Sequence, residues 1–253
     1  EVKYLRTEGL ITGEKGSIQF FHQTFYDYCY ARDFVERQGG HLYNYLVALA
    51  HQGLFIRSSI RQVLSYLRTY NPKQYISELR KLLFSEGIRY HIKRLVVDHL
   101  SFESNPTFKE LEIIIELTGK NKILASSFFY NIPNDNWYRL FIKEQTTIVK
   151  LINRVGEQLQ EDVARFVVFY VNNDIEATYG LLQKVIDDGE RYSLIDWTLI
   201  RTQDFTKSIV LKSYQDINIH YISSGRQRFQ ILDTAISSNP NFAIEEVKKI
   251  CSN

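Results

Sequence analysis

A histidine, a carboxylate and a cysteine near the start of the chain could together perform nucleophilic chemistry. His22 and Cys29 are seven residues apart and would share one face of a helix, with Asp27 between them. A cysteine nucleophile needs a neighbouring base and donors for the developing oxyanion. No glycine loop that could supply such donors accompanies these residues, and a cysteine among aromatic residues is typical of core packing. We therefore predict no catalytic residue in this chain.

Two further groups contain residues of the types that bind metals, but their spacing is unsuitable. His91 and His99 lie eight residues apart on an expected helix, too far for one ion, and Asp98 is between them. The run at 187–190 (Asp-Asp-Gly-Glu) lacks the alternating ligand spacing of an EF-hand loop, which favours a solvated turn. The chain has only two cysteines, which exclude a four-cysteine zinc site and a disulfide framework and suggest a reducing compartment. The sequence thus predicts neither a metal nor a bound cofactor in these residues.

Positive charge is concentrated in one part of the chain. Residues 51–97 contain nine Lys and Arg against two acids, whereas residues 98–200 contain ten against sixteen. At 3.6 residues per turn, part of this charge forms a stripe along two expected helices; its members are Arg57, Arg61, Arg68, Arg89, Lys93 and Arg94. Nucleic acid could bind such a stripe through its phosphates. We favour the alternative, a solvated face or a surface that meets an acidic domain of the same protein.

The composition predicts an ordered, soluble protein. With 253 residues, 44% of them hydrophobic and 24% charged, the chain can bury a sizeable core. No apolar run reaches the roughly 18 residues that a membrane span requires. We expect no membrane association and a cytoplasmic location.

From Gln23 onward the hydrophobic pattern is helical, and it is interrupted at regular intervals. An apolar helical stretch is followed by Asn and then Pro or Asp at four places: 71–72, 105–106, 173–174 and 239–240. The four asparagines are 34, 68 and 66 residues apart, which is one, two and two steps of about 34. Asn is a favoured helix N-cap and Pro a favoured first helical residue. Each pair is therefore predicted to open the second helix of a repeat.

The helices that follow these pairs carry apolar stripes that they cannot bury alone. In two copies the stripes are Tyr75, Ile76, Leu79, Leu82 and Leu83, and Phe108, Leu111, Ile114 and Ile115. Neighbouring pairs must stack to cover them. We predict an all-α domain over residues 22–253, an α-solenoid of the HEAT or TPR kind.

The first 21 residues are predicted to form a β-hairpin. Residues 4–11 and 17–21 have strand character, and residues 12–16 form a glycine-rich turn. An isolated two-stranded hairpin is only marginally stable. We therefore expect residues 1–21 to belong to a domain that begins upstream.

The stretch at 18–32 reads Ile-Gln-Phe-Phe-His-Gln-Thr-Phe-Tyr-Asp-Tyr-Cys-Tyr-Ala-Arg. The order of two aromatics, His22, Thr24, Phe25, an acid and Ala31 resembles the end of the winged-helix domain of STAND NTPases of the NACHT type. These are signalling ATPases that include many bacterial defence proteins. The resemblance covers roughly the first forty residues, and Asp27 stands where that family usually has Glu.

The resemblance implies a nucleotide-sensing role for His22. In that family the histidine at this place contacts the phosphate of bound ADP and ties the winged helix to the nucleotide-binding domain. The alternative for His22 is packing or capping at the first turn of its own helix. ATP or ADP and Mg²⁺ would bind upstream, since this chain has no G-x-x-x-x-G-K-[ST] phosphate loop. The family also implies oligomerisation of the full-length protein on activation.

Three functions follow from these expectations. The first, which we favour, is the non-catalytic sensor arm of a STAND NTPase, whose partner is a protein or the upstream NTPase domain. The second is a free-standing solenoid scaffold. The third is a helical repeat that binds nucleic acid through the basic stripe.

Overall fold

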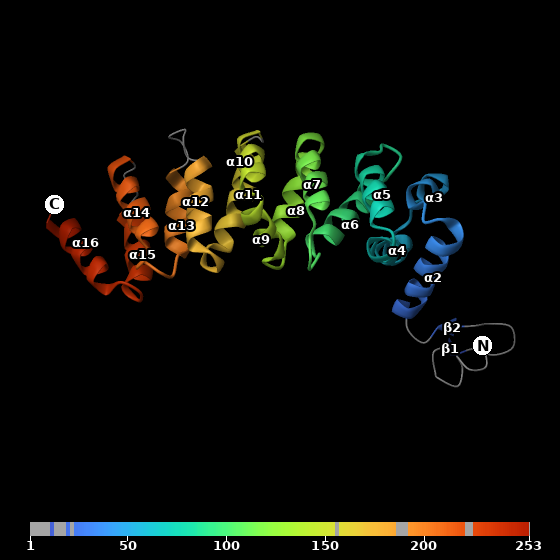
Figure 1. Cartoon of the computed structure of the whole chain (residues 1–253), viewed down its shortest axis with the longest axis horizontal. Coiled ribbons are helices and arrows are strands. Elements are labelled where there is room, and N and C mark those ends of the chain that lie inside the picture. Colours follow the sequence, from blue (N-terminus) through green and yellow to red (C-terminus); the bar gives the residue numbers. More distant parts are fainter. Residues whose placement is uncertain are drawn as a thin grey trace. The chain divides into compact units, whose positions relative to one another are not determined.

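The computed structural model describes residues 11–12, 19–20, 23–154, 157–185, 192–220 and 225–252. Nearly all of these residues are helical (Figure 1). The all-α class predicted from the sequence is therefore correct for the described part of the chain. The protein divides into two compact units, the first made of residues 1–100 and 109–120 and the second of residues 101–108 and 121–253.

Two short strands precede the helices. In the described residues, β1 (Ile11–Thr12) pairs antiparallel with β2 (Gln19–Phe20), and Ile11 lies opposite Phe20. The turn predicted at 12–16 would begin inside β1. The rest of the predicted hairpin lies outside the described residues, so the winged-helix remnant at 1–21 remains a prediction.

The helices of the first unit follow one another with short connections. They are α2 (Gln23–Gln38), α3 (Leu42–Ala48), α4 (Arg57–Tyr70), α5 (Pro72–Phe84), α6 (Tyr90–Ser101) and α7 (Phe108–Lys120), with the 3-10 helix η1 (Leu54–Ile56) before α4. Helix α2 packs on α4, α4 packs on α5, and α3 packs on α5. The buried faces are largely aliphatic, as in α4, where Ile60, Val63, Leu64 and Leu67 are inaccessible to solvent. This spacing is that of an amphipathic helix.

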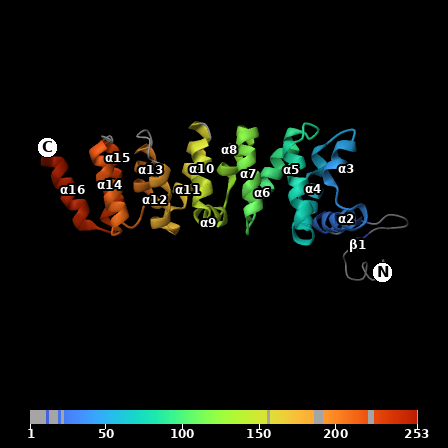
Figure 2. The ribbon, with the colours of Figure 1, turned by 45° about the horizontal axis from the view of Figure 1, so that its top comes forward.

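The second unit is built in the same way. Its helices are α8 (Lys122–Asn131), α9 (Asn136–Lys143), α10 (Gln145–Arg154), α11 (Glu157–Phe169), α12 (Ile175–Val185), α13 (Tyr192–Arg201), α14 (Ser208–His220), α15 (Gly225–Ile236) and α16 (Pro240–Ser252), with the 3-10 helix η2 (Val171–Asn173) before α12. Helices α8, α11, α13 and α15 pack in that order as one layer, and α10, α12 and α14 form a second. In Figure 2, α10 and α11 are followed along this unit by α12 and α13 and then by α14 and α15.

The predicted helix starts are correct at two of the four places. Asn71 caps α5 by accepting from the Gln74 backbone N–H at 3.3 Å, and Asn239 caps α16 by accepting from the Phe242 N–H at 3.2 Å. Pro72 and Pro240 are the first residues of these helices. The predicted starts are therefore confirmed at these two Asn-Pro pairs.

The other two predicted starts are wrong in detail. Helix α7 begins at Phe108, after Thr107, so 105–106 does not open it; Thr is itself a favoured N-cap residue. Before α12, Asn173 belongs to η2, and Asp174 supplies the cap by accepting from the Ala177 N–H at 2.9 Å. The asparagine pattern also misses one cap, Asn121, which accepts from the Leu124 N–H at 3.1 Å at the start of α8.

Six of the nine predicted stripe residues are buried, Ile76 and Ile115 are half-buried, and Phe108 is exposed. Leu79, Leu82, Leu111 and Ile114 are fully inaccessible, whereas Phe108 is 43% exposed. The assignment of Phe108 to the stripe is wrong because α7 begins at that residue, two positions later than the sequence indicates.

The turn between α2 and α3 requires two glycines. Gly39 and Gly40 have φ values of 70° and 65°, in the left-handed region that residues with a Cβ atom avoid. A Cβ at Gly40 would also lie 2.9 Å from a methyl carbon of Leu67. The turn brings the backbone of α3 next to α5.

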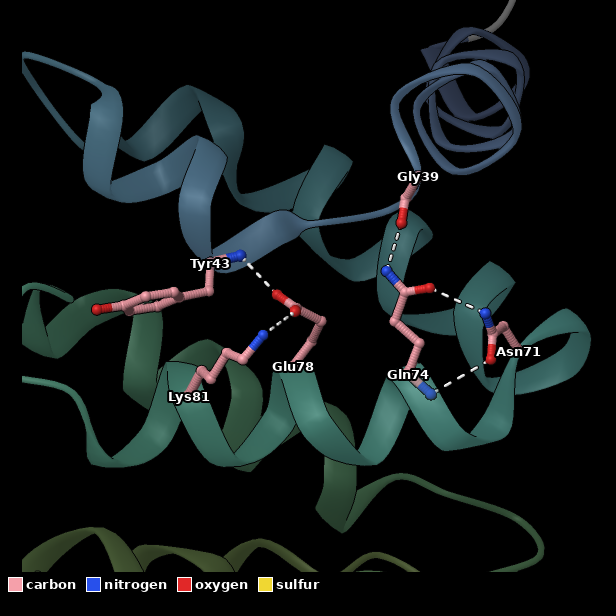
Figure 3. Close-up of polar contacts among 6 residues, drawn as sticks. All are labelled: Gly39, Tyr43, Asn71, Gln74, Glu78 and Lys81. Atoms are coloured by element: carbon pink, nitrogen blue, oxygen red, sulfur yellow. Dashed lines mark hydrogen bonds and ion pairs between the residues drawn. The ribbon is translucent and has the colours of Figure 1, made fainter.

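The side chains of Gln74 and Glu78 then link this turn and the start of α3 to α5 by hydrogen bonds (Figure 3). Glu78 accepts from the backbone N–H of Tyr43 at 2.7 Å and forms an ion pair with Lys81 at 2.9 Å. Gln74 donates to the carbonyl of Gly39 while its side chain pairs with that of Asn71. Two helical pairs are thus joined by specific hydrogen bonds as well as by apolar contact.

Several side-chain hydrogen bonds join residues about 35 positions apart. In the first unit Tyr43 meets Glu78 and Tyr75 meets Glu110, both at a separation of 35 residues. In the second unit the separations are 36 residues for Ser126 with Asp162 and 34 residues for Asn239 with Phe205. These values agree with the interval of about 34 that the asparagine spacing predicts.

Candidate interaction surface

Of the three residues weighed for nucleophilic chemistry, Asp27 makes hydrogen bonds that link two helices. Asp27 in α2 is buried and accepts hydrogen bonds from the hydroxyls of Ser58 and Ser59, each at 3.4 Å. These serines lie in the first turn of α4, whose free N–H groups and helix dipole favour a carboxylate. Asp27 therefore ties α2 to the start of α4. Cys29 is half-buried, and His22 lies outside the described residues.

The two histidines of α6 do not converge on a common point. His99 is buried against the ring of Tyr75, with 6.3 Å between ring centroids, and Asp98 forms an ion pair with Arg94 at 3.1 Å. Burial lowers the pKa of His99 to about 4, and the positive charges of Arg61 and Arg68 act in the same direction. Among the residues that the structure describes, no three His, Cys, Asp or Glu side chains are grouped to hold a metal. The predicted turn at 187–190 falls outside these residues.

The basic stripe is only partly available to a ligand. Arg68 is 24% exposed, and its guanidinium binds the carboxylate of Glu110 at 2.8 and 3.3 Å. Arg94 is paired with Asp98, and the Nε of Arg57 is buried. Arg61 and Arg89 are exposed, and Lys93 is half-buried. Nothing in the local sequence indicates that Glu110, 42 residues away, neutralises Arg68.

A second group of cations lies on the layer formed by α8, α11 and α13. Arg165 of α11 lies over the indole of Trp197 in α13, and Arg201 of α13 lies over the ring of Phe169 in α11; each guanidinium is 5.4 Å from the ring centroid. Tyr130 of α8 lines the same hollow as Arg165, Phe169 and Arg201. We call these five residues, Tyr130, Arg165, Phe169, Trp197 and Arg201, the aromatic–arginine surface.

The three aromatic residues of this surface are unusually exposed for their size. Solvent reaches 78% of Tyr130, 59% of Phe169 and 44% of Trp197. Large exposed aromatics in one place are typical of interaction sites, and Tyr, Trp and Arg are the residues most enriched in them. The surface therefore has the composition of a binding site.

A hollow of about 240 Å³ lies within the surface. Its lining consists mainly of aromatic residues from α8 and α11: Phe129, Tyr130, Ile132, Asp162, Arg165, Phe166, Phe169, Tyr170 and Arg201. Three of the aromatic rings pack on one another, with 6.4 Å between the centroids of Phe129 and Phe166 and 5.5 Å between those of Phe166 and Tyr170. Such packing makes the hollow preformed.

Few acids are close to the two arginines. Asp162, which lines the hollow, is buried and accepts a hydrogen bond from the hydroxyl of Ser126. Glu161 is exposed one turn before Arg165 on α11. Within the described part of the chain, no ion pair joins Arg165 or Arg201 to a carboxylate.

A larger groove of about 770 Å³ lies between α15 and α16. It contains exposed apolar residues, Phe229, Ile236, Ile244 and Val247, with charged residues at Arg226, Asp233 and Lys248. It differs from the aromatic–arginine surface because it has no cation stacked on an exposed ring. We therefore take the aromatic–arginine surface as the candidate site.

The sequence carries a signal for this surface that is neither a known motif nor a run of charge. Arg165 and Phe169 are four residues apart on α11, Trp197 and Arg201 are four apart on α13, and both stacks join residues 32 positions apart. Because i and i+4 share a helix face, two such pairs at about one repeat interval indicate neighbouring exposed positions. The order of cation and ring is reversed between the helices, so each arginine meets a ring.

No family model, curated protein or solved structure matches the chain. None of the helices in the described ranges combines the length and the apolar character needed to cross a bilayer.

Proposed function

We propose that this chain is a non-catalytic helical-repeat arm that recognises a protein partner. The observation that carries this proposal is the aromatic–arginine surface, in which exposed rings and arginines from three successive layer helices surround a preformed hollow. Rigid aromatic anchors and arginines contribute most of the binding energy at protein interfaces.

The architecture proposed for the arm is an α-solenoid of stacked helical pairs. Two features support it: the order of packing within each unit and the polar contacts between residues 34 to 36 positions apart. In a solenoid each repeat contacts its neighbours and leaves a long face open to a partner. This arrangement suits a sensor or scaffold better than an enclosed active site.

The cellular context that we propose is a STAND NTPase of the NACHT type, in the cytoplasm, with ATP or ADP and Mg²⁺ bound upstream. This part rests on the resemblance of residues 18–32. The arm would hold the NTPase inactive until its partner binds, and oligomerisation would follow. His22 is the proposed link to the nucleotide.

The interaction role is tested by site-specific photo-crosslinking in the full-length protein inside its host cell. A photoreactive residue replaces Tyr130 in one variant and Lys212, an exposed residue of α14, in the other. We expect a defined crosslinked protein from position 130 only, and its loss when Phe169→Asp is added. Equal products from both positions, or none from position 130, would contradict an interaction site on this surface.

The nucleotide link is tested separately in the protein that includes the NTPase. His22→Ala is expected to reduce ADP retention and to raise basal signalling, because an imidazole that contacts the phosphate is lost. His41→Ala is the matched control, since His41 lies outside the motif. Unchanged nucleotide retention in His22→Ala would remove the histidine assignment and leave the interaction role intact.

A further inference from the structure

The two arginines of the aromatic–arginine surface are held in place by the rings that they cover. A guanidinium over an indole or phenyl ring gains cation–π attraction and loses part of its freedom. Arg165 and Arg201 are both exposed, so their planar donor groups are presented to solvent. Their orientation therefore favours binding of an anionic group. A carboxylate can accept two parallel hydrogen bonds from one guanidinium.

Several other arginines of the described residues are already paired with carboxylates, whereas these two stack on rings. Arg68, Arg80, Arg94 and Arg139 each form an ion pair with a described carboxylate. No such pair is formed by Arg165 or Arg201 with any acid in the described ranges. The surface therefore has two positive charges that a partner can neutralise.

The size of the hollow limits what can enter it. At about 240 Å³ it is smaller than the roughly 300–1,000 Å³ of pockets that enclose a small-molecule ligand. It can receive an apolar side chain from a larger partner, as hot-spot pockets at protein interfaces do.

Charge over the whole unit argues against nucleic acid. The second unit contains 15 Lys and Arg against 17 Asp and Glu. Single-stranded nucleic acid is held by a positively charged groove that follows several phosphates. Two cations on a unit of net negative charge do not form such a groove.

From these observations we infer that the aromatic–arginine surface binds an acidic segment of a partner protein. Two carboxylates of the segment pair with Arg165 and Arg201, and an apolar side chain enters the hollow beside Tyr130. This inference rests on the proposed function, because it names the class of partner for the same surface.

The helix geometry also sets the spacing of the two carboxylates. The two stacks are four residues apart along α11 and α13, a rise of about 6 Å, and adjacent helix axes are about 8–10 Å apart. The guanidinium groups are therefore on the order of 10 Å apart. A segment in the polyproline II conformation has three residues per turn and advances about 3.1 Å per residue, so acids three residues apart share one face and match this separation best.

Glu161 influences the direction in which the acidic segment can run across the surface. It lies one turn before Arg165 on α11 and is exposed, so it repels an acid that approaches from that side. The acidic segment should continue past Arg201 and not past Glu161. Substitution Glu161→Gln is then expected to strengthen binding about two- to fivefold, in line with the weak coupling typical of exposed charge pairs.

The test is fluorescence anisotropy with the purified chain and labelled twelve-residue peptides. One peptide has a Leu flanked by two Glu three residues apart, a second has the same composition with adjacent Glu residues, and a third has Gln in place of Glu. Twelve-nucleotide oligouridylate is the fourth probe. We expect the first peptide to bind at least tenfold more tightly than the Gln peptide, and the adjacent-Glu peptide to be intermediate.

Variants of the chain identify the groups responsible. Arg165→Gln with Arg201→Gln is expected to weaken binding of the first peptide at least tenfold, whereas Lys212→Gln, an exposed charge loss on α14, leaves it unchanged. Trp197→Leu, which keeps both charges but removes one stack, is expected to weaken binding about threefold. Circular dichroism melts confirm that each variant is folded.

Three outcomes would overturn the inference. The Gln peptide could bind as tightly as the Glu peptides, the double arginine variant could bind the first peptide normally, or no peptide could bind at all. Arginine-dependent binding of oligouridylate that exceeds peptide binding would assign the surface to nucleic acid instead. A crosslinked partner at position 130 without acidic-peptide binding would leave the proposed function standing and remove only the acidic class of ligand.

Discussion

Glu110 is a buried carboxylate that two side chains share. It is inaccessible to solvent, binds the guanidinium of Arg68 at 2.8 Å and accepts from the hydroxyl of Tyr75 at 3.0 Å. These contacts join α7 to both α4 and α5. Placing a charge in this position is favourable only because both partners are present.

Glu110→Ala is therefore expected to destabilise the protein by about 2–4 kcal/mol, since it leaves Arg68 and the Tyr75 hydroxyl without this acceptor. Urea unfolding measures the change, and Glu112→Ala, an exposed acid on the same helix, serves as the control. Glu110→Gln should be milder because it keeps the acceptor oxygen. Similar costs at positions 110 and 112 would show that the buried pair contributes little.

His99 makes stability depend on pH. Its pKa is about 4 in the folded protein, because burial and the nearby Arg61 and Arg68 disfavour the imidazolium while Glu110 partly opposes them; an unfolded histidine titrates near 6.5. Between these values the unfolded chain binds more protons, so stability rises with pH. The stabilisation is complete above about pH 6.5 and is lost as the pH falls towards 4.

We expect a loss of up to about 3 kcal/mol between pH 7.5 and pH 4 from this one histidine. Urea midpoints measured across that range for the parent and for His99→Gln separate its contribution from that of the carboxylates. The variant should show a shallower slope. Parallel slopes would mean that His99 is not titrating differently in the two states.

At the scale of elements, Gln52 lies in the connection that follows α3. Its side chain hydrogen-bonds that connection to the one between α5 and α6. Its amide N–H₂ donates to the carbonyls of Leu46 and Gly87 at 3.1 and 2.8 Å, and its oxygen accepts from the Arg89 N–H at 2.8 Å. The residue is buried. It satisfies backbone groups that the end of α3 and the start of α6 would otherwise leave without partners.

Gln52→Glu keeps the shape of the side chain but places an anion against two carbonyl oxygens. We expect a loss of about 2–3 kcal/mol at pH 7, comparable to that of Gln52→Ala. Thermal unfolding followed by circular dichroism provides the measurement, and Gln230→Glu on the exposed side of α15 is the control. A harmless Gln52→Glu would indicate that water replaces the amide.

How far the sequence predicts these elements depends on whether the signal is local. Asn71 and Asn239 can be recognised because a cap and a following proline act within three residues. Before α7 the sequence offers two favoured cap residues, Asn105 and Thr107, and the helix begins directly after the second. Local chemistry alone does not decide between two good cap residues.

The candidate site depends on contacts between distant residues. The basic stripe follows from one helical face, but Arg68 points to Glu110 on α7. The stacks of Arg165 on Trp197 and of Arg201 on Phe169 form only when α11 lies beside α13. Periodicity locates helices, whereas the packing between them decides which charged residues remain open to a ligand.

At the scale of the whole molecule, the proposed solenoid makes a prediction about size. A compact globule of 253 residues has a radius of gyration of about 18 Å, whereas serially stacked helical pairs form a longer particle. Small-angle X-ray scattering of the dilute chain should therefore give a value clearly above about 18 Å and an asymmetric distance distribution. A radius of gyration close to that of a globule at all concentrations would contradict the stacked arrangement.

The unequal surroundings of the two tryptophans have a practical consequence. Trp137 is fully buried among phenylalanine rings, whereas Trp197 is exposed beneath the guanidinium of Arg165. Acrylamide will thus quench the emission of one indole and hardly reach the other. The protein contains its own optical reporter, so occupancy of the site can be followed in unmodified material without any dye.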